Sequence, residues 1–324
     1  MRDLVRDTYL DHDAGRTVNP PSYFLTFPDA PRNRIIALPG ALTGDLPVSG
    51  IKWISSWPGN VASGTPRASA VTVLNDAATG FPTACLESSL ISAARTAASA
   101  ALAAEKLSEG RARPSTVSFI GAGPIARTIH RYLVGTGWSF SRTLVHDLSR
   151  ERAESFAASI GDGAEVAAGS EQAIREAELV VFATVAPAPH VVDPNWFTHH
   201  PLVLHVSLRD LGEEVIVSAQ NIVDDVNHVL QANTSVHLVE QRTGERGFID
   251  GTIAQVVSGQ VAPRADRTVV FSPFGLGVLD LALARYVLES TPEGERITIP
   301  GFFPSVAFDT DEGVGLSGSQ VRGS

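Results

Sequence analysis

The stretch TVSFIGAGPIARTIH (residues 116–130) decides the fold of this chain. Five residues typical of a buried strand lead into a glycine-rich turn, and a helical sequence follows the turn. Gly121 and Gly123 have the spacing G-x-G-x-x-A. In a dinucleotide-binding turn, the first glycine permits the tight bend and the second lets the backbone approach a pyrophosphate. The stretch therefore predicts a strand–turn–helix unit that binds a dinucleotide.

The helix after this turn and the end of the next strand complete the predicted cofactor site. The helix begins near Pro124 and Ile125, where N–H groups and the positive end of the helix dipole face the phosphates. Ala126 permits close packing of this helix on the strand. Asp147 lies 26 positions after the first glycine, and its carboxylate can accept both ribose hydroxyls. It repels a 2′-phosphate, which favours NAD over NADP. Asp147 or Ser149 can also begin the following helix as an N-cap, and the two roles are compatible.

Predicted strands and helices alternate from Ser115 onward, which is typical of a parallel sheet. The fold class is therefore α/β, with a Rossmann-type doubly wound parallel sheet. The predicted strands are 116–120, 143–146, 179–184, 201–207, 221–226 and 268–272. The predicted helices are 125–134, 150–160, a region over 235–258 that is broken at 244–247, and 277–289.

The residues before Ser115 have a different pattern, which predicts a second, α+β domain. An amphipathic helix comes first, and short strands separated by Pro/Gly/Asn turns then predict an antiparallel or mixed sheet. An alanine-rich helix precedes the boundary at ARPS (112–115). The predicted helices are 2–13 and 87–107, and the predicted strands are 23–27, 34–38, 51–56 and 70–74.

Composition excludes several classes of function for this chain of 324 residues. The net charge of −10 argues against a nucleic-acid partner. No apolar run approaches the roughly 20 residues of a membrane span, and the charged N-terminus does not resemble a signal peptide, so we expect a cytoplasmic protein. The nine histidines show no metal-ligand spacing. The single cysteine, Cys85, excludes an internal disulfide, and its apolar neighbours predict a buried thiol.

Several charged residues would be interpreted as structural if the local pattern alone were considered. Lys52 interrupts the strand pattern of GIKWISSWPGN (50–60), and such a lysine usually faces solvent. Arg95 lies in an alanine-rich helix, and Asp210 lies in a turn-like sequence, where structural roles are the commoner ones. Glu87, Asp280 and Arg285 are helical charges that we interpret as structural.

The chain nevertheless resembles the ornithine cyclodeaminase/mu-crystallin family over nearly its whole length. The segments that carry this resemblance are GIKWISSWPGN, SLISAARTAASAALAAEKL, FIGAGPIA and HVSLRDL. Others are similar to a branch of dehydrogenases that release L-2,3-diaminopropionate, namely VNPPSYFL, RIIALPG, SLRDL and NIVDDVNHVL. The branch implies NAD-dependent oxidative hydrolysis of N-(1-amino-1-carboxy-2-ethyl)-glutamate to 2-oxoglutarate and L-2,3-diaminopropionate, for a siderophore or peptide natural product.

The resemblance also implies roles for individual residues. Lys52 matches a catalytic lysine that contacts the substrate carboxylate, and Arg95 matches the arginine that clamps this carboxylate. Thr96 matches a contact to the cofactor phosphate, and Asp210 resembles the acid/base aspartate. Further matches line the ribose and the nicotinamide, namely Ala183, Thr184, Val185, Ser207, Ser272 and Phe274.

One position departs from the family pattern. Many members have an arginine after the Pro-Pro near the N-terminus, where this chain has Ser22. Arg34 is a candidate replacement that would contact the substrate. The changed pocket argues against the alternatives within the family, an ornithine cyclodeaminase or an alanine or imino-acid dehydrogenase. Intact Lys52, Arg95 and Asp210 argue against a non-catalytic, mu-crystallin-like nucleotide-binding protein.

The resemblance finally implies how the chain is divided and assembled. Residues 1–113, together with a tail of about 290–324, form a domain that binds the small amino-acid substrate and makes a homodimer through its sheet. Residues 114–289 form the NAD-binding Rossmann domain, and the active site lies between the two.

Overall fold

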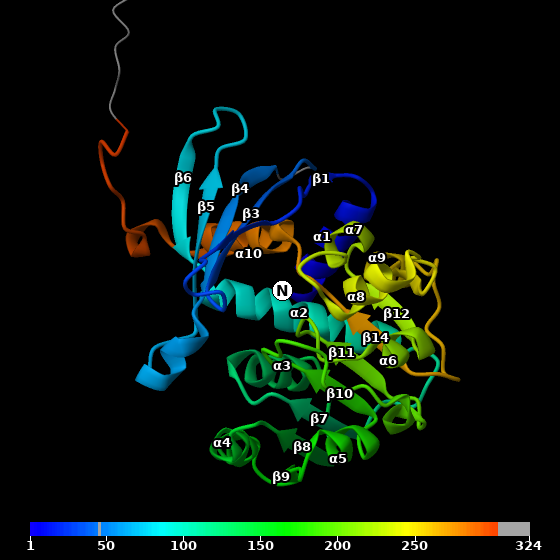
Figure 1. The fold of residues 1–324 in the computed structure, drawn as a ribbon. Helices are drawn as coiled ribbons and strands as arrows, with labels where there is room; N and C mark the ends of the chain where they lie inside the picture. Colours follow the sequence, from blue (N-terminus) through cyan, green and yellow to red (C-terminus); the bar gives the residue numbers. More distant parts are fainter. Residues whose placement is uncertain (45–46, 304–324) are drawn as a thin grey trace, which may run out of the picture. The chain divides into compact units, whose positions relative to one another are not determined.

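The structure is a computed structural model that describes residues 1–44 and 47–303. Met1–Leu288 pack as one compact unit, and a second unit begins at Glu289. Much of the tail that the sequence assigns to the first domain, residues 304–324, lies outside the described residues. The predicted α/β class is confirmed, since the first unit contains one antiparallel and one parallel sheet (Figure 1).

The N-terminal part of the chain forms the antiparallel sheet, with six strands in the described residues. Its order is β1-β3-β4-β5-β6, and β2 also pairs with β3. The bounds are β1 (Thr17–Val18), β2 (Tyr23–Thr26), β3 (Arg34–Leu42), β4 (Val48–Ser56), β5 (Ala68–Asn75) and β6 (Pro82–Glu87). β1 and β6 were not predicted, because β1 is only two residues long and β6 follows directly on a turn sequence.

The second sheet is parallel and has the strand order β13-β12-β14-β11-β10-β7-β8-β9 in the part that the structure describes. β7 and β10 are adjacent, and the chain winds away from them in both directions, as in a doubly wound fold. The strands are β7 (Thr116–Ile120), β8 (Arg142–His146), β9 (Ala164–Val166), β10 (Leu179–Phe182), β11 (Leu202–His205), β12 (Gln220–Val223), β13 (Ile249–Thr252) and β14 (Val269–Ser272). The short β13 lies in a region that the sequence predicted to be helical.

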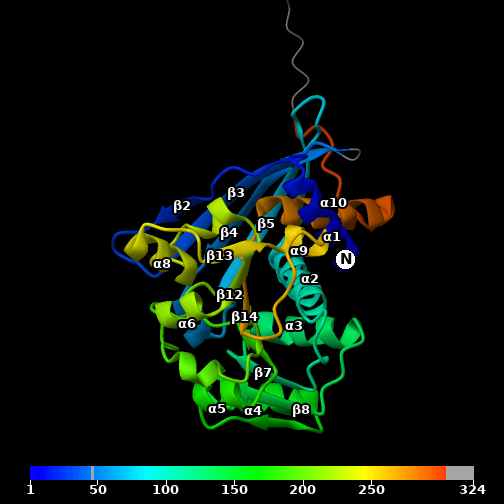
Figure 2. The ribbon, with the colours of Figure 1, turned by 90° about the vertical axis from the view of Figure 1, so that its right-hand side faces the viewer.

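The helices agree closely with the longer predicted segments. They are α1 (Arg2–Asp13), α2 (Ser89–Leu107), α3 (Pro124–Gly135), α4 (Arg150–Ile160), α5 (Ser170–Arg175), α6 (Glu213–Ser218), α7 (Val226–Val229), α8 (Ser235–Thr243), α9 (Ile253–Val257) and α10 (Gly277–Ser290), with short 3-10 helices at Pro58–Ser63, Pro194–Phe197 and Glu293–Glu295. Helix α2 contacts both β5 and α3, so it lies between the two sheets (Figure 2). The short helices α5, α6 and α7 were not predicted, because each has fewer than two turns.

Helix α10 packs on the face of the antiparallel sheet that carries Leu38 and Lys52, which we call the inner face. A Cβ atom on Gly277 would lie only 3.1 Å from the Cβ atom of Leu38. Leu38 and Lys52 are directly opposite each other on β3 and β4, so their side chains share this face. The first residues of α10 are therefore held against the centre of the sheet.

Two expectations from composition have different outcomes. No helix in the described residues is long and apolar enough to cross a membrane. The expectation of a buried Cys85 is wrong, because the thiol is exposed. Cys85 pairs with Val73 on the opposite, outer face of the sheet, and strand alternation points both side chains away from α10.

Candidate active site

The glycine-rich turn after β7 has the backbone geometry that the sequence predicts. Gly121 has a φ angle of +97°, which disfavours any residue with a side chain. A Cβ atom at this position would also lie 2.5 Å from the carbonyl oxygen of Ala183, at the end of β10. Gly121 is therefore required by the turn and by the close approach of the neighbouring strand.

Gly123 is different, because its missing side chain leaves open space. A Cβ atom there would meet no described atom within 4 Å. Gly123 is the N-cap of α3, and no described side chain caps this helix. The N–H groups of the first turn are thus available to an anion, and Ala126 is completely buried on the other side of the helix. The turn fits a dinucleotide pyrophosphate.

Asp147 lies half-buried beside this turn. One carboxylate oxygen accepts the N–H of Ala122 at 2.8 Å, and the other accepts the N–H of Ser149 at 2.8 Å. Ser149, and not Asp147, is the N-cap of α4. A carboxylate oxygen can accept more than one hydrogen bond, so Asp147 is fixed in place and keeps capacity for ribose hydroxyls.

A buried ion cluster lies between the inner face and α10. Lys52 is 1% exposed, so the expectation of a solvent-facing lysine is overturned. Its Nζ lies 2.6 Å from Oδ2 of Asp280, and Nε of Arg95 lies 3.2 Å from Oδ1 of the same carboxylate. We call Lys52, Arg95 and Asp280 the lysine cluster. One carboxylate thus holds two cations, and the cluster carries a net positive charge.

The environment changes the protonation of Lys52. Burial lowers the pKa of Lys52 to about 8, the charge of Asp280 opposes this shift, and the charge of Arg95 adds to it. An amine with this pKa exchanges protons near neutral pH.

Arg95 is positioned from both sides. Besides Asp280, the loop after β14 lies against its guanidinium, since a Cβ atom on Gly275 would be 2.5 Å from Nη1. The N–H groups of Phe274 and Gly275 donate to the buried carboxylate of Asp224, at 3.0 and 2.6 Å. Asp224 therefore fixes the loop that fixes Arg95.

A second buried carboxylate, Asp210, lies near the carboxyl ends of β10 and β11. Its oxygens bind the hydroxyls of Thr184 and Ser207 and, at 3.1 Å, Nε2 of His190. His205 completes the group at 3.4 Å. We call these five residues the aspartate cluster. Burial raises the pKa of Asp210, but hydrogen bonds from His190, His205 and Ser207 outweigh it, and the pKa lies well below its usual range.

The aspartate cluster brings several residues of the predicted cofactor site together. The hydroxyl of Ser272, at the end of β14, lies 3.1 Å from Nδ1 of His205. Ala183 and Thr184 are half-buried, whereas Val185 is 58% exposed and offers an apolar surface. Thr96 is half-buried on α2 and follows Arg95 directly in the sequence.

Neither Ser22 nor Arg34 is a member of the lysine cluster. The buried hydroxyl of Ser22 lies 3.2 Å from Nε2 of His228. Arg34 begins β3 opposite Ser56, four positions along β4 from Lys52. It shares the inner face with Lys52, but its Cα lies about 13 Å further along the strand.

Sequence reasoning missed Asp280, which it interpreted as structural, and His190, which it did not consider. Asp280 is a single acid in the first turn of an otherwise apolar helical sequence, GVLDLALA, so its burial had a visible signal. His190 follows a loop of alternating Ala and Pro, where no pattern marks its role.

The family described as "Ornithine cyclodeaminase/mu-crystallin family" matches residues 2–295. The chain belongs to this family. The strand–turn–helix unit and the inner-face lysine lie within the matched residues.

Members of the family with known names differ in substrate. The N-((2S)-2-amino-2-carboxyethyl)-L-glutamate dehydrogenase of Staphylococcus aureus is 27% identical over 81% of this chain and 80% of the relative. The NAD(P)H-dependent anabolic L-arginine dehydrogenase of Pseudomonas aeruginosa is 30% identical over 86% and 89%. The crystal structure of CmnK has a TM-score of 0.81 and 32% identity, and it covers 89% of each chain.

Proposed function

We propose that this chain is an NAD-dependent dehydrogenase of N-(1-amino-1-carboxy-2-ethyl)-glutamate. The glutamate α-carbon is oxidised to the imine, and water divides the imine into 2-oxoglutarate and L-2,3-diaminopropionate, with release of NADH and a proton. The diaminopropionate would enter a siderophore or a peptide natural product. The buried Lys52 beside Arg95, with its pKa lowered to about 8, carries this proposal.

The similarity to the Staphylococcus aureus dehydrogenase supports this choice of substrate within the family. The relatives also include an arginine dehydrogenase, and the reaction that all these names share is oxidation or reduction at a carbon–nitrogen bond. The CH–NH bond is therefore the common element, and the acidic substrate is the specific part of the proposal.

The cofactor-binding residues follow from the turn and the strand ends. Gly121, Gly123 and the first turn of α3, with Pro124 and Ile125, would hold the pyrophosphate, and Thr96 is a further phosphate contact. Asp147 would bind the adenosine ribose. The remaining residues would surround the nicotinamide and its ribose, namely Ala183, Thr184, Val185, Ser207 and Ser272. When bound, NAD would accept a hydride from the substrate carbon.

The lysine cluster would bind and deprotonate the substrate. Nε of Arg95 donates to Asp280. Its two terminal nitrogens would form parallel hydrogen bonds to the substrate carboxylate. The substrate amine must be neutral before its carbon can lose a hydride, because the nitrogen lone pair forms the new C=N bond. Lys52 can accept this proton, since its pKa is close to the working pH.

The aspartate cluster would activate the water that hydrolyses the imine. Asp210 is fully buried, whereas the side chain of His190 is 40% exposed and lies 3.1 Å from it. We therefore propose that Asp210 acts through His190. The imidazole takes the proton from water, and the carboxylate orients and stabilises the imidazolium, as in other Asp–His pairs.

The assay follows NADH by its near-ultraviolet absorbance when the protein is mixed with NAD and this substrate. We expect NADH, 2-oxoglutarate and diaminopropionate in equal amounts. L-ornithine, L-alanine and L-proline serve as control substrates. Absence of NADH, with folded protein and measurable NAD binding, would contradict the proposal. Proline formed from ornithine without net NADH would identify a cyclodeaminase instead.

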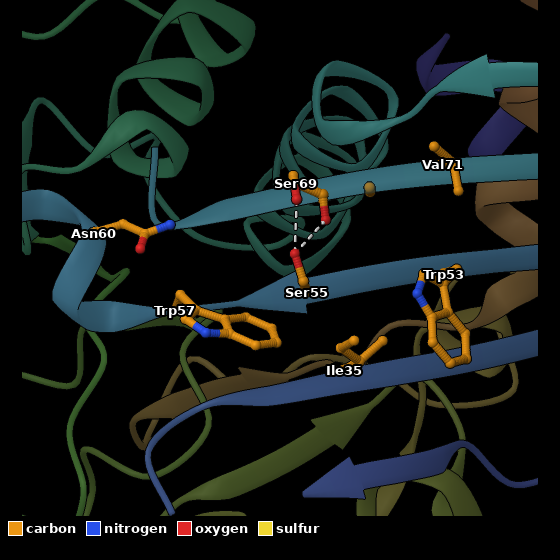
Figure 3. A pocket seen from close by; sticks show the side chains of 8 residues that line it. Ile35, Trp53, Ser55, Trp57, Asn60, Ser69 and Val71 are labelled. Atoms are coloured by element: carbon orange, nitrogen blue, oxygen red, sulfur yellow. Dashed lines mark hydrogen bonds between the residues drawn. The ribbon is translucent and has the colours of Figure 1, made fainter. Parts of the chain in front are cut away.

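The proposal includes a homodimer formed through the outer face of the antiparallel sheet. Tyr23, Trp53 and Val71 lie in one row across β2, β4 and β5 through Ala37 on β3, and they are 64%, 42% and 41% exposed. An open hollow of about 490 Å³ beside this row is lined by Ile35, Trp53, Trp57 and Val71 (Figure 3). Such an apolar patch is typical of a protein interface.

Analytical ultracentrifugation tests the dimer. We expect a dimeric wild type and a monomeric Trp53→Asp variant, whereas Leu90→Asp, at an exposed residue on α2, should stay dimeric. A dimeric Trp53→Asp variant would contradict this interface.

We further propose that residues 1–113, with the tail of about 290–324, bind substrate, and that residues 114–289 bind NAD. A cytoplasmic location is part of the proposal, because the reaction consumes the NAD of that compartment.

A further inference from the structure

A group of three arginines lies on the inner face, away from the lysine cluster. Arg34 is opposite Ser56 in the register of β3 and β4, and Nη1 of Arg67 donates to the hydroxyl of Ser56 at 2.7 Å. Arg209 enters from the loop after β11, where its Nη2 donates to the carbonyl of Ala232 at 2.7 Å. We call Arg34, Arg67 and Arg209 the arginine group.

The arginine group forms no ion pair in the described residues, although the charge of the neighbouring Asp210 acts on Arg209 and opposes the effect of burial on its pKa. In residues 1–44 and 47–303, none of its three guanidinium groups is within 4.0 Å of a carboxylate. The buried Nε atoms of Arg34 and Arg209 have no hydrogen-bond partner among the described residues. Each such atom costs free energy unless a ligand satisfies it. Converging unpaired cations of this kind point to an anion that is bound during function.

Electrostatic effects agree with a separate group. Burial lowers the pKa of Arg34, and the charges of Arg209 and Arg67 lower it further. The charges that act on Lys52 are those of Asp280 and Arg95. The two cationic groups are therefore distinct, and Arg34 belongs with Arg67 and Arg209.

We propose that Arg34, Arg67 and Arg209 form a second anion-binding subsite, which holds a substrate carboxylate other than the one at Arg95. This inference rests on the proposed function and explains its preference for an acidic substrate. Arg34 lies on the same inner face as Lys52, about 13 Å further along it, and Arg209 adjoins Asp210 in sequence, so a long substrate could reach from the lysine cluster to the subsite. The proposed substrate has three carboxylates, two in its glutamate part and one in its diaminopropionate part. Ornithine and alanine have one each, so this subsite distinguishes them from the proposed substrate.

Binding to the NADH complex tests the subsite without turnover. The probes are 2-oxoglutarate, 2-oxovalerate, which has the same chain length but no distal carboxylate, and L-2,3-diaminopropionate. Calorimetry gives each dissociation constant for the wild type, for Arg34→Met and for Arg209→Met. Arg32→Met is the matched control. Arg32 is exposed, and its replacement removes the same charge two positions away from Arg34.

We expect the wild type to prefer 2-oxoglutarate over 2-oxovalerate by at least 10-fold, and each subsite variant to lose most of this preference while Arg32→Met keeps it. A loss confined to diaminopropionate would assign the subsite to the other half of the substrate and would also support the proposal. Unchanged binding of both probes, or weakened NADH binding alone, would overturn it.

Stability provides an independent readout. Because Arg34→Met removes a buried cation without a partner, the ligand-free variant should unfold at the same temperature as the wild type or a higher one. A structural role would lower that temperature and overturn the proposal.

The proposed function can fail separately from the subsite. If the wild type binds 2-oxoglutarate through the arginine group but forms no NADH, the reaction is wrong and the subsite stands. If NADH forms and Arg209→Met leaves the KM of the substrate unchanged, the reaction stands and the subsite is wrong.

Discussion

Asp280 and Asp210 are both completely buried carboxylates, yet their surroundings are opposite. Asp280 lies between two cations, Lys52 and Arg95, at 2.6 and 3.2 Å. Asp210 is surrounded by hydroxyl and imidazole groups. The first carboxylate neutralises part of a positive site, and the second is itself the charge that its neighbours stabilise.

This difference assigns different work to the two clusters. In the lysine cluster, the mobile proton is on Lys52, because burial and Arg95 lower its pKa to about 8 against the effect of Asp280. In the aspartate cluster, the carboxylate stays ionised, since its pKa is far below the usual range. In the proposed mechanism, the exposed His190 therefore takes the proton from water. Substitutions in each cluster should therefore have different effects on catalysis and stability.

Replacing Lys52 should affect catalysis most. Lys52→Met removes the proposed base and should lower kcat by about 10³-fold, within the usual range for general-base catalysis. Steady-state NADH formation measures this effect, and NADH binding followed by fluorescence shows whether the cofactor site is intact. A kcat within 10-fold of the wild type would exclude Lys52 as the base.

Replacing Asp280 should affect stability as well as activity. Asp280→Asn leaves two buried cations without their carboxylate, and the free energy of unfolding should fall by about 3 kcal/mol. Urea unfolding measures this loss. The double variant Asp280→Asn/Lys52→Met should recover part of the lost stability, because one of the unpaired cations is gone. If Asp280→Asn and the double variant were equally stable, Asp280 would not stabilise the charge of Lys52.

Replacing Asp210 should slow hydrolysis more than substrate binding. Asp210→Asn removes the charge that stabilises the His190 imidazolium, and kcat should fall by about 10²-fold with little change in KM. His190→Gln should behave alike, and the double variant should be no slower than either single variant, since the two residues act as a unit. The control is Asp193→Asn, at the half-buried N-cap of the 3-10 helix Pro194–Phe197. Additive losses in the double variant would show that Asp210 does not act through His190.

Replacing Gly123 should have a smaller effect and should weaken only the binding of the cofactor. Gly123→Val places a side chain where the protein itself leaves space, so folding should be unchanged. The KM for NAD should rise by about 10-fold, while the KM for the amino-acid substrate stays the same. Gly137→Val is a control outside the turn, also without described neighbours, although its positive φ makes it less stable. An unchanged KM for NAD would mean that the pyrophosphate lies elsewhere.

The sequence predicted the parts of this fold that depend on local pattern. The turn at Gly121 and the strand–helix order after Ser115 follow from neighbouring residues, and the structure confirms both. β13 was missed because it is a short strand inside a helical pattern, and Cys85 was placed on the wrong face because apolar neighbours do not show which face of a sheet is covered.

The candidate site was harder to predict because its contacts are distant in sequence. Lys52 and Asp280 are 228 positions apart, and no local pattern pairs them. Lys52 and Arg95 were named only through the resemblance to a family. Arg34 was named as a candidate substrate contact from the departure at Ser22, but its grouping with Arg67 and Arg209 is visible only in the structure, because the three arginines come from separate segments.

The protonation of Lys52 decides whether the lysine cluster can supply a base, and it can be measured without any substrate. The chain has only two lysines, Lys52 and Lys106, so protein labelled with ¹³C at the lysine ε-carbon gives two signals. Lys52→Arg assigns them by removing one. We predict that the Lys52 signal titrates with a midpoint near pH 8. A midpoint at or above 10.5, the ordinary value for lysine, would contradict the role of Lys52 as a base.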